Sequence, residues 1–252
     1  MAIEYGPKGL IGVLTPQANT TAEPEFGILW PPGYAMIAAR MTSDCGTLLE
    51  RLVDYVDRVD ETLRQFHNAP VDALSFACTG SAYLIGAARE DALIDRLSER
   101  LGVPFLSAGK AVTTALDALG AKRIGLLSPY PSDLTEAALP YWTSRGFEVA
   151  GVAGTAVDNS SFHAIYTIRS ETASEALAAF EGQRLDAVLL LGTGMPTLKT
   201  ILKTPNLGGA PVLSCNLALA WATIAAIEHR PPDLRAWIAG DDWRRRYTER
   251  FA

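Results

Sequence analysis

Histidine and cysteine, the side chains that most often bind transition metals, are scarce in this sequence, which has three of each among 252 residues. His67, His163 and His229 stand at no spacing from a cysteine or a carboxylate that would form a ligand cluster, and no CxxC pair occurs. We therefore expect no metal site. The sequence also lacks a GxGxxG fingerprint after its first predicted strand, a phosphate-binding P-loop and a GxSxG serine turn. These absences argue against dinucleotide-dependent enzymes, P-loop nucleotide hydrolases and serine hydrolases.

Long apolar runs and basic stripes are also missing. No uncharged apolar run reaches the roughly 20 residues that a membrane-spanning helix needs, and residues 1–6 do not have the basic-then-apolar pattern of a secretion signal. The net charge is −6, and we expect the one basic cluster, Arg244–Arg246, at a solvated helix end. An odd number of cysteines without a pairing pattern favours a reducing cytoplasm. Neither nucleic acid nor a membrane is therefore an expected partner.

The composition is otherwise that of a globular protein with a full core, because 48% of the residues are hydrophobic and 20% are charged. Apolar runs alternate with helical patterns, which predicts an α/β fold with parallel sheets and right-handed crossovers. Strands are expected at 10–14, 34–41, 71–77, 103–107, 123–128, 147–152, 187–191 and 211–214. Helices are expected at 22–29, 48–66, 82–101, 111–119, 134–145, 168–180, 198–203 and 218–227.

Cys78 stands where a predicted buried strand ends and a helix begins. Residues 71–77 are mainly apolar, small and hydroxyl residues follow, and a helical pattern starts at Ala82. Ligands bind at this edge of open α/β sheets. A helix N-terminus also attracts anions and lowers the pKa of a thiol. Cys78 is therefore a candidate reactive thiol facing a carboxylate or phosphate, and the alternative is a buried, inert cysteine.

The pattern around Cys78 occurs a second time in the chain. Asp72-Ala73 and Thr79-Gly80 match Asp186-Ala187 and Thr193-Gly194, and Gly192 stands in the place of Cys78. Two flanking blocks repeat in the same order, with 11–16 matching 124–129 and 103–107 matching 210–214. The repeat predicts two pseudo-symmetric, Rossmann-like halves with the active site in the cleft between them. We expect the first half at residues 1–115 and 217–252, and the second half at 116–216.

The motifs resemble those of the aspartate/glutamate racemase superfamily, in the branch that holds maleate cis-trans isomerase and arylmalonate decarboxylase. The resemblance covers nearly the whole chain and rests on Pro16, Asn19-Thr20-Thr21, Cys78-Thr79-Gly80, Pro129-Tyr130, Asp158-Asn159 and Met195-Pro196. It implies two pseudo-symmetric halves with the substrate between them and no organic cofactor. It also implies that a substrate carboxylate is held by Thr79, Gly80, Tyr130, Thr193 and Gly194. Asn19 and Asn159 would position a dicarboxylate, and Pro16 would line the pocket.

The sequence departs from this family pattern at Gly192. Racemases and maleate isomerases carry a cysteine at the equivalent strand end in both halves, whereas arylmalonate decarboxylase keeps one, on the half opposite to that of Cys78. Cys215 does not replace the missing thiol, because it aligns with Ala108 at a different strand end. The chain therefore combines isomerase-like loops with a single candidate thiol, and Gly192 is expected among the substrate-binding residues together with Thr193 and Gly194.

The function expected from the resemblance is cofactor-independent, cysteine-dependent chemistry on a small carboxylate. Maleate-type cis-trans isomerisation with Cys78 as nucleophile is the first expectation, because several loop residues favour it; Tyr130 or water would supply an acid. Decarboxylation of an arylmalonate-type acid, with Cys78 as proton donor, is the alternative, since one thiol is enough for it. A non-catalytic carboxylate-binding protein is a second alternative. A homodimer is left open.

Overall fold

Two sheets form the framework of the protein. The computed structural model describes residues 3–155 and 164–251. In the first half, β1 (Gly9–Pro16), β2 (Tyr34–Met41), β3 (Ala73–Phe76) and β4 (Phe105–Ser107) form a four-stranded sheet in the order β2-β1-β3-β4. In the second half, β5 (Arg123–Ser128), β6 (Glu148–Gly154), β7 (Ala187–Leu190), β8 (Asn206–Leu207) and β9 (Ala210–Ser214) form a five-stranded sheet in the order β6-β5-β7-β9-β8.

The two sheets have the same topology, because β1, β2, β3 and β4 occupy the places of β5, β6, β7 and β9. Neighbouring strands are parallel in every described pair except β8 with β9. The antiparallel strand β8 is a difference from the expected all-parallel sheets. It is a short edge hairpin made by residues that the sequence patterns left as a loop. The predicted α/β fold with two similar halves is confirmed.

Asp72 and Asp186, the aspartates of the repeated motif, accept equivalent hydrogen bonds in the two halves. Asp72 Oδ2 accepts a hydrogen bond of 2.7 Å from the backbone N–H of Leu10, next to the start of β1. Asp186 Oδ2 accepts hydrogen bonds of 2.8 Å and 2.7 Å from the N–H groups of Lys122 and Arg123 at the start of β5. Each aspartate therefore satisfies donors that the sheet leaves unpaired at its amino edge. This explains the repeated Asp-Ala before each of the two central strands.

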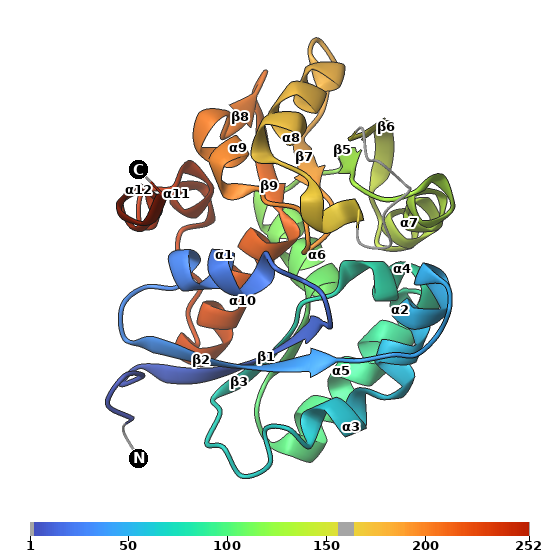
Figure 1. Ribbon diagram of the computed structural model, residues 1–252. Helices are drawn as coiled ribbons and strands as arrows, with labels where there is room; N and C mark the ends of the chain where they lie inside the picture. Colours follow the sequence, from blue (N-terminus) through green and yellow to red (C-terminus); the bar gives the residue numbers. More distant parts are fainter. Residues whose placement is uncertain (1–2, 156–163, 252) are drawn as a thin grey trace.

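Helices connect the strands and fill the space around the sheets (Figure 1). The first half contains α1 (Ala22–Leu29), α2 (Leu48–Asp57), α3 (Val59–Leu63), α4 (Thr79–Ile85), α5 (Ala87–Leu101) and α6 (Ala108–Leu119). The later helices are α7 (Ser132–Ser144), α8 (Ser170–Ala176), α9 (Leu198–Lys203), α10 (Cys215–Glu228), α11 (Leu234–Ala239) and α12 (Arg244–Phe251). Two short 3₁₀ helices, η1 (Ala164–Thr167) and η2 (Leu177–Phe180), complete the second half.

Two helices near Cys78 differ from the expectation. The single helix expected at 48–66 is divided into α2 and α3 at Arg58, whose φ and ψ of −103° and 16° are not helical. Thr47 starts α2 with a capping box, in which its side chain and that of Glu50 each bond the other's backbone N–H. The helix expected at 82–101 begins earlier, at Thr79, with Cys78 as its N-cap residue, and it is divided into α4 and α5 at Gly86, whose φ is +79°. Cys78 therefore lies at the junction between β3 and α4.

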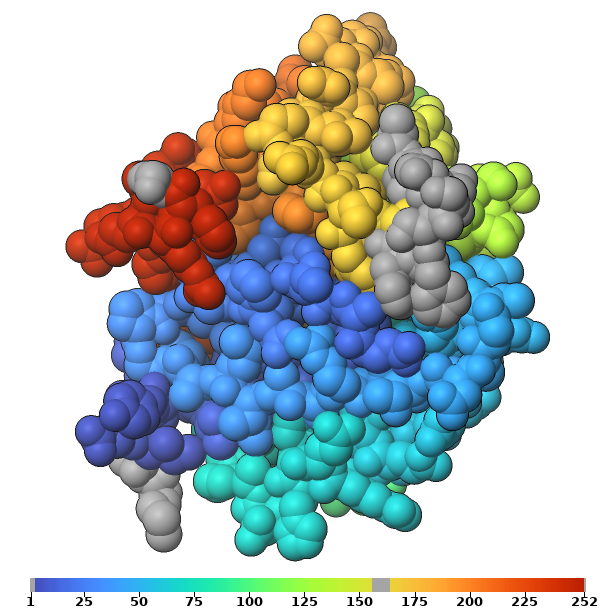
Figure 2. All heavy atoms as spheres, in the orientation of Figure 1, coloured from blue at the N-terminus to red at the C-terminus, as the bar shows by residue number. Residues whose placement is uncertain are grey.

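The C-terminal segment contacts both halves. Figure 2 shows α12, in red, beside the blue α1 segment below and the orange segment above. Arg246 of α12 donates hydrogen bonds to the carbonyl groups of Ile28 and Leu29 in α1. We predicted that this tail packs on the first half, and α12 does so, whereas α11 also contacts β9 and α9 of the second half. The domain boundaries expected at 115, 116, 216 and 217 stay a prediction. Among the described residues, no helix combines the length and apolar character that a membrane crossing requires.

Candidate active site

A cavity of about 370 Å³ lies between the halves, at the edge where β1, β3, β5 and β7 end. Its volume is at the small end of the range for ligand pockets, so it suits a small molecule. The first half contributes Pro16, Gln17, Ala18, Gly46, Leu48, Arg51, Leu52, Tyr55, Cys78, Thr79 and Gly80. The second half contributes Pro129, Tyr130, Pro131, Ala164, Ile165, Tyr166, Thr193 and Gly194.

Most of the predicted site residues meet in this cavity. Seven of them line it: Pro16, Cys78, Thr79, Gly80, Tyr130, Thr193 and Gly194. Asn19 and Gly192 are not among the lining residues, although both lie directly behind them, as described below. Asn159, the tenth predicted residue, lies outside the described residues, as do Asp158 and His163.

Cys78 is fixed by the residue one turn into α4. Its Sγ lies 3.2 Å from Ser81 Oγ, and Ser81 Oγ donates its proton to the carbonyl of Leu52 at 2.7 Å. Because the single hydroxyl proton of Ser81 is used for Leu52, the thiol S–H is the donor in its contact with Ser81. Ser81 is fully buried and Cys78 is only 3% exposed. The sulfur therefore has a defined position on the cavity wall.

The thiol of Cys78 is protonated in this setting. Burial raises its pKa above the ordinary value of a cysteine, and this effect outweighs the Ser81 side chain and the N–H groups of Ser81 and Gly80, which lower it. The expectation that the helix N-terminus gives a lowered pKa is therefore wrong in direction. The reason is that the first turn of α4 lies in an apolar interior, where the cost of desolvating a thiolate is larger than the attraction of the helix end.

Tyr130 and Thr79 place two hydroxyl groups near Cys78. Burial, followed by the nearby Cys215 and Cys78 thiols, raises the pKa of Tyr130 well above its ordinary value, so its hydroxyl remains a donor. The Tyr130 ring packs edge-on against Tyr83 at 6.2 Å between centroids. Thr79 is 1% exposed, and its Oγ1 has no hydrogen-bond partner of good geometry among the described residues. The Thr79 side chain also lowers the pKa values of Tyr130 and Cys215 as a neighbouring hydrogen-bonding group, so the two hydroxyl groups belong to one polar cluster in the cavity wall.

The turn after β7 lies opposite Cys78. Thr193 Oγ1 donates a hydrogen bond of 2.8 Å to the carbonyl of Ala77, the residue that precedes Cys78. Gly194 approaches Tyr166 so closely that a Cβ atom at position 194 would lie 2.5 Å from the Tyr166 ring. Gly192 has a φ of +84°, and a Cβ atom there would lie 3.1 Å from the Tyr130 hydroxyl. The glycines therefore let this turn approach the cavity closely.

Asn19 connects the turns of the two halves from behind the cavity. Its Oδ1 accepts hydrogen bonds from the N–H groups of Thr21 and Ala22 at 2.8 Å and 3.0 Å, at the start of α1. Its Nδ2 donates to Thr193 Oγ1 at 3.2 Å. These bonds give Asn19 a positioning role in this structure. Its role as a direct substrate ligand stays a prediction.

Glu25 is a buried carboxylate under the same turn, and sequence reasoning did not single it out. Its oxygens accept hydrogen bonds from the N–H groups of Thr197 and Leu198 at 2.6 Å and 3.2 Å, and from Asn216 Nδ2 at 2.8 Å. Asn216 Nδ2 also donates to the carbonyl of Thr193 at 3.1 Å. Burial raises the pKa of Glu25, and the four groups that donate to it lower it. Glu25 thus ties α1 to α9 and α10 across the halves.

Three further cavity residues were missed. Arg51 and Tyr55 are buried residues of α2, and Tyr166 lies on η1. A signal for Arg51 is present in the sequence, since Leu48, Arg51, Leu52 and Tyr55 share one face of a helix by their spacing. Cys215 lies behind the wall, where burial raises its pKa to about 11.

The chain is similar to proteins of one enzyme family. The model of the arylmalonate decarboxylase family matches residues 11–236. A maleate isomerase of Pseudomonas putida is 24% identical over 246 residues, which is 91% of this chain and 97% of the relative. An arylmalonate decarboxylase of Bordetella bronchiseptica is 25% identical over 223 residues, or 82% of this chain and 91% of the relative.

A solved structure supports the fold. A Nocardia farcinica maleate cis-trans isomerase, in which a serine replaces a cysteine and a succinylcysteine intermediate is covalently bound, superposes with a TM-score of 0.77 at 22% identity. The alignment covers 88% of this chain and 94% of that one. The family match spans most of the chain and the relatives have both of the activities in the branch predicted from the motifs. The chain therefore belongs to the arylmalonate decarboxylase family.

Proposed function

We propose that the protein is a cofactor-independent enzyme that isomerises a maleate-type cis dicarboxylate to its trans form, with Cys78 as nucleophile. The observation that carries the proposal is the position of Cys78, whose sulfur is fixed on the wall of a small cavity with hydroxyl groups and two turns around it. Cysteine is intrinsically nucleophilic enough to add to an activated double bond. The covalent succinylcysteine in the Nocardia farcinica isomerase supports the same type of intermediate here.

The reaction balances without a cofactor. Cys78 first gives its proton to solvent, its thiolate sulfur adds to one carbon of the double bond, and a proton from water reaches the other carbon. The former double bond is now a single bond and can rotate. Loss of a proton from the second carbon and departure of the sulfur restore the double bond in the trans form, and the thiol is regenerated. Both carboxylates are retained throughout.

Negative charge develops on the carboxylate next to the carbon that gains and loses the proton. Tyr130 and Thr79 place hydroxyl donors at the cavity wall, and the turns at Gly80 and at Thr193-Gly194 face each other across it. Preorganised donors of this kind stabilise an enediolate strongly in a site shielded from water. Tyr130 suits the role because its raised pKa keeps its proton in place.

Decarboxylation of a substituted malonate is the second candidate, and the protonated state of Cys78 favours it. In this reaction the C–C bond to one carboxylate breaks, CO₂ leaves, and the electron pair remains on the cradled carboxylate as an enediolate. Cys78 then gives its proton to the α-carbon and regains one from solvent. The apolar walls formed by Leu48, Leu52 and Ile165 suit a leaving carboxylate that becomes neutral. A protein that binds a carboxylate without turnover is the third possibility.

Turnover measurements separate these functions. The purified protein is incubated with maleate, phenylmalonate and methylmalonate, and products are followed by proton NMR. We expect fumarate from maleate. Cys78→Ala should abolish turnover and keep the circular dichroism spectrum, whereas Cys45→Ala, which removes a partly exposed thiol, serves as the matched control. A Cys78→Ala variant with near-normal activity would refute the mechanism, and CO₂ release from a malonate without isomerisation would select the second candidate.

A further inference from the structure

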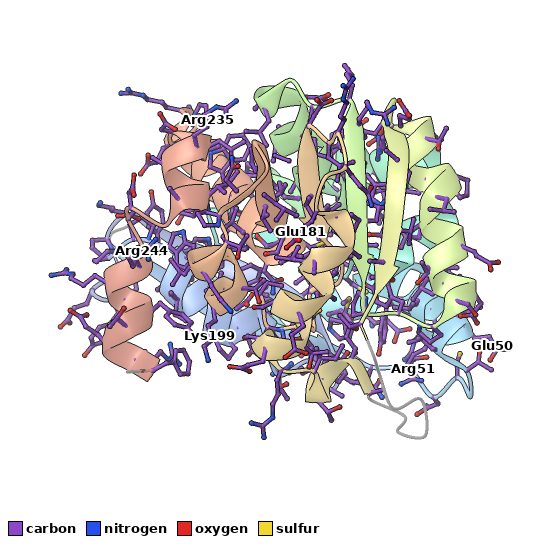
Figure 3. The ribbon with its side chains drawn as sticks, turned by 90° about the horizontal axis from the view of Figure 1, so that it is seen from above. Glu50, Arg51, Glu181, Lys199, Arg235 and Arg244 are labelled. Carbon is purple, nitrogen blue, oxygen red and sulfur yellow. The ribbon has the colours of Figure 1, made fainter. Side chains whose placement is uncertain are left out.

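Arg51 is the only cationic side chain among the described residues that line the cavity. The residue is 3% exposed, whereas the neighbouring Glu50 on α2 is exposed. Figure 3 labels both residues and shows Glu50 at the periphery, with Arg51 nearer the middle of the molecule. The cavity wall therefore carries a guanidinium group held in a low-dielectric environment, where its attraction for an anion is strong.

The position of Arg51 is coupled to that of Cys78 through α2. The carbonyl of Leu52, the next residue, accepts the hydrogen bond from Ser81 that fixes the Cys78 thiol. Tyr55, one helical turn after Arg51 on α2, also lines the cavity, and burial followed by the Cys78 thiol raises its pKa to about 12, whereas the nearby Arg51 lowers it. The capping box of Thr47 and Glu50 fixes the start of α2 at Leu48, three residues before Arg51. Arg51 thus belongs to the same rigid wall as the thiol.

We propose that Arg51 binds the second carboxylate of a dicarboxylate substrate and so determines which acids the site accepts. This inference rests on the proposed function for its reaction. The first carboxylate occupies the donors around Tyr130, Thr79 and Gly80, and the second pairs with the planar guanidinium of Arg51, which matches a carboxylate with two parallel hydrogen bonds. The substrate then lies between the two anchors, with its central carbons facing Cys78.

The same placement distinguishes the two candidate reactions. A leaving carboxylate loses its charge when it becomes CO₂, so a cation beside it stabilises the ground state more than the transition state. An isomerisation keeps both carboxylates charged, so the same cation binds substrate and product alike without that penalty. Arg51 at the second carboxylate therefore favours a reaction in which no carboxylate departs.

Binding of two unreactive acids to the intact protein tests the role of Arg51. Succinate carries two carboxylates, butyrate carries one on a chain of equal length, and neither has a double bond that Cys78 could attack. Isothermal titration calorimetry measures the Kd of each acid for the wild-type protein and for two variants. Arg51→Gln removes the charge, and Arg51→Lys keeps the charge but removes the planar guanidinium that can donate two parallel hydrogen bonds. The control is Arg89→Gln, which removes a cation from an exposed ion pair with Asp57 outside the cavity.

We expect the wild-type protein to prefer succinate, and Arg51→Gln to weaken succinate binding about tenfold to a hundredfold, because a charge-assisted hydrogen-bonded pair is lost. Butyrate binding should change by less than about threefold, and Arg51→Lys should lose part of the succinate affinity. If Arg51→Gln does not fold, Arg51→Lys decides the question, because its affinity for succinate should fall more than its affinity for butyrate.

Equal losses for both acids, an unchanged succinate affinity, or no succinate binding by the wild-type protein would each overturn the assignment. The proposed function fails separately. An Arg51-dependent preference for succinate without turnover of maleate would refute the isomerisation and keep the role of Arg51. Turnover of maleate that does not depend on Arg51 would refute the role of Arg51 and keep the isomerisation.

Discussion

The side-chain amide of Asn19 donates a hydrogen bond to Thr193 Oγ1, and Thr193 Oγ1 in turn donates to the carbonyl of Ala77. This chain of two bonds joins the turn after β1, the turn after β7 and the end of β3, which carries Cys78. The two halves of the site are therefore held in register by a buried polar contact and not by packing alone. Buried hydrogen bonds of this kind cost more when one partner is removed than they contribute when formed.

Asn19→Ala is expected to destabilise the protein by about 1–3 kcal/mol, because the N–H groups of Thr21 and Ala22 and the hydroxyl of Thr193 lose a buried partner. Activity should fall as well, since the Thr193 turn is no longer held opposite Cys78. Urea unfolding and steady-state kinetics measure the two effects. The exposed neighbour Thr20→Ala is the control. An Asn19→Ala variant that matches Thr20→Ala in stability would contradict the positioning role.

Tyr130→Phe tests whether the hydroxyl acts as a donor to the substrate carboxylate, since the change removes one oxygen and opens no hole. Loss of one donor in a site shielded from water should cost about 3 kcal/mol of transition-state stabilisation, or about a hundredfold in kcat/KM. Tyr5→Phe, at a residue that is 82% exposed, controls for the substitution itself. A kcat/KM within about twofold of the wild-type value would remove Tyr130 from the reaction.

The pH dependence of the rate separates a thiolate nucleophile from a thiol proton donor. Burial raises the pKa of Cys78, so the thiol is the major form near neutral pH. If the attacking form is the thiolate, kcat/KM should rise about tenfold per pH unit from about pH 6.5 to about pH 8.5, since its population grows in that proportion below the pKa. If the thiol donates a proton, kcat/KM should stay level there and fall only above the raised pKa.

We expect the rising profile, in line with the proposed isomerisation. Incorporation of solvent deuterium into the product is a useful companion measurement, because the proton that reaches carbon comes from water in the isomerisation and from the solvent-exchanging thiol in the decarboxylation. A flat profile together with CO₂ release would contradict the nucleophilic role. A flat profile with isomerisation would mean that another group removes the Cys78 proton once substrate is bound.

The framework of the site follows from local patterns that the sequence shows directly. Asp72 and Asp186 mark equivalent places in two copies of one motif, so the repeat predicts both sheets and the position of Cys78 at a strand end. Apolar runs locate the strands because burial on both faces leaves few polar residues in them. Parallel strands then bring their carboxyl ends to one edge, which explains why seven of the predicted residues line one cavity.

The remaining parts of the site depend on contacts between distant segments. Glu25 lies in a short helix, and its partners Thr197 and Asn216 are far along the chain, so no local pattern shows that it is buried. The raised pKa of Cys78 depends in the same way on how completely the second half covers the first turn of α4. Arg51 was missed for another reason. Its place on one helix face with Leu48, Leu52 and Tyr55 is visible in the sequence, but only the fold shows that this face lines a cavity.

Gly192 is the place where a second thiol would complete a two-sided site. The residue has a φ of +84°, and a Cβ atom there would lie 3.0 Å from Pro129 Cγ and 3.1 Å from both Ile165 Cδ1 and the Tyr130 hydroxyl. A side chain at this position therefore points toward Tyr130. Both the backbone conformation and the close contacts oppose a larger residue. Gly192→Ala and Gly192→Cys should each lose about 1–3 kcal/mol of stability for the left-handed conformation.

The two variants should nevertheless differ in chemistry. With Cys78 as the single thiol, a proton reaches a prochiral carbon from one face, whereas Gly192→Cys adds a second acid–base group on the other face. We predict that Gly192→Cys, and not Gly192→Ala, exchanges the α-hydrogen of a 2-arylpropionate with deuterium from solvent and erodes its optical purity. NMR and chiral chromatography measure these two changes, and Cys78→Ala in the same background should stop both. If Gly192→Cys folds, binds the acid and shows neither exchange nor racemisation, then positions 78 and 192 do not face a common carbon, and the two-sided site inferred from the repeat is wrong.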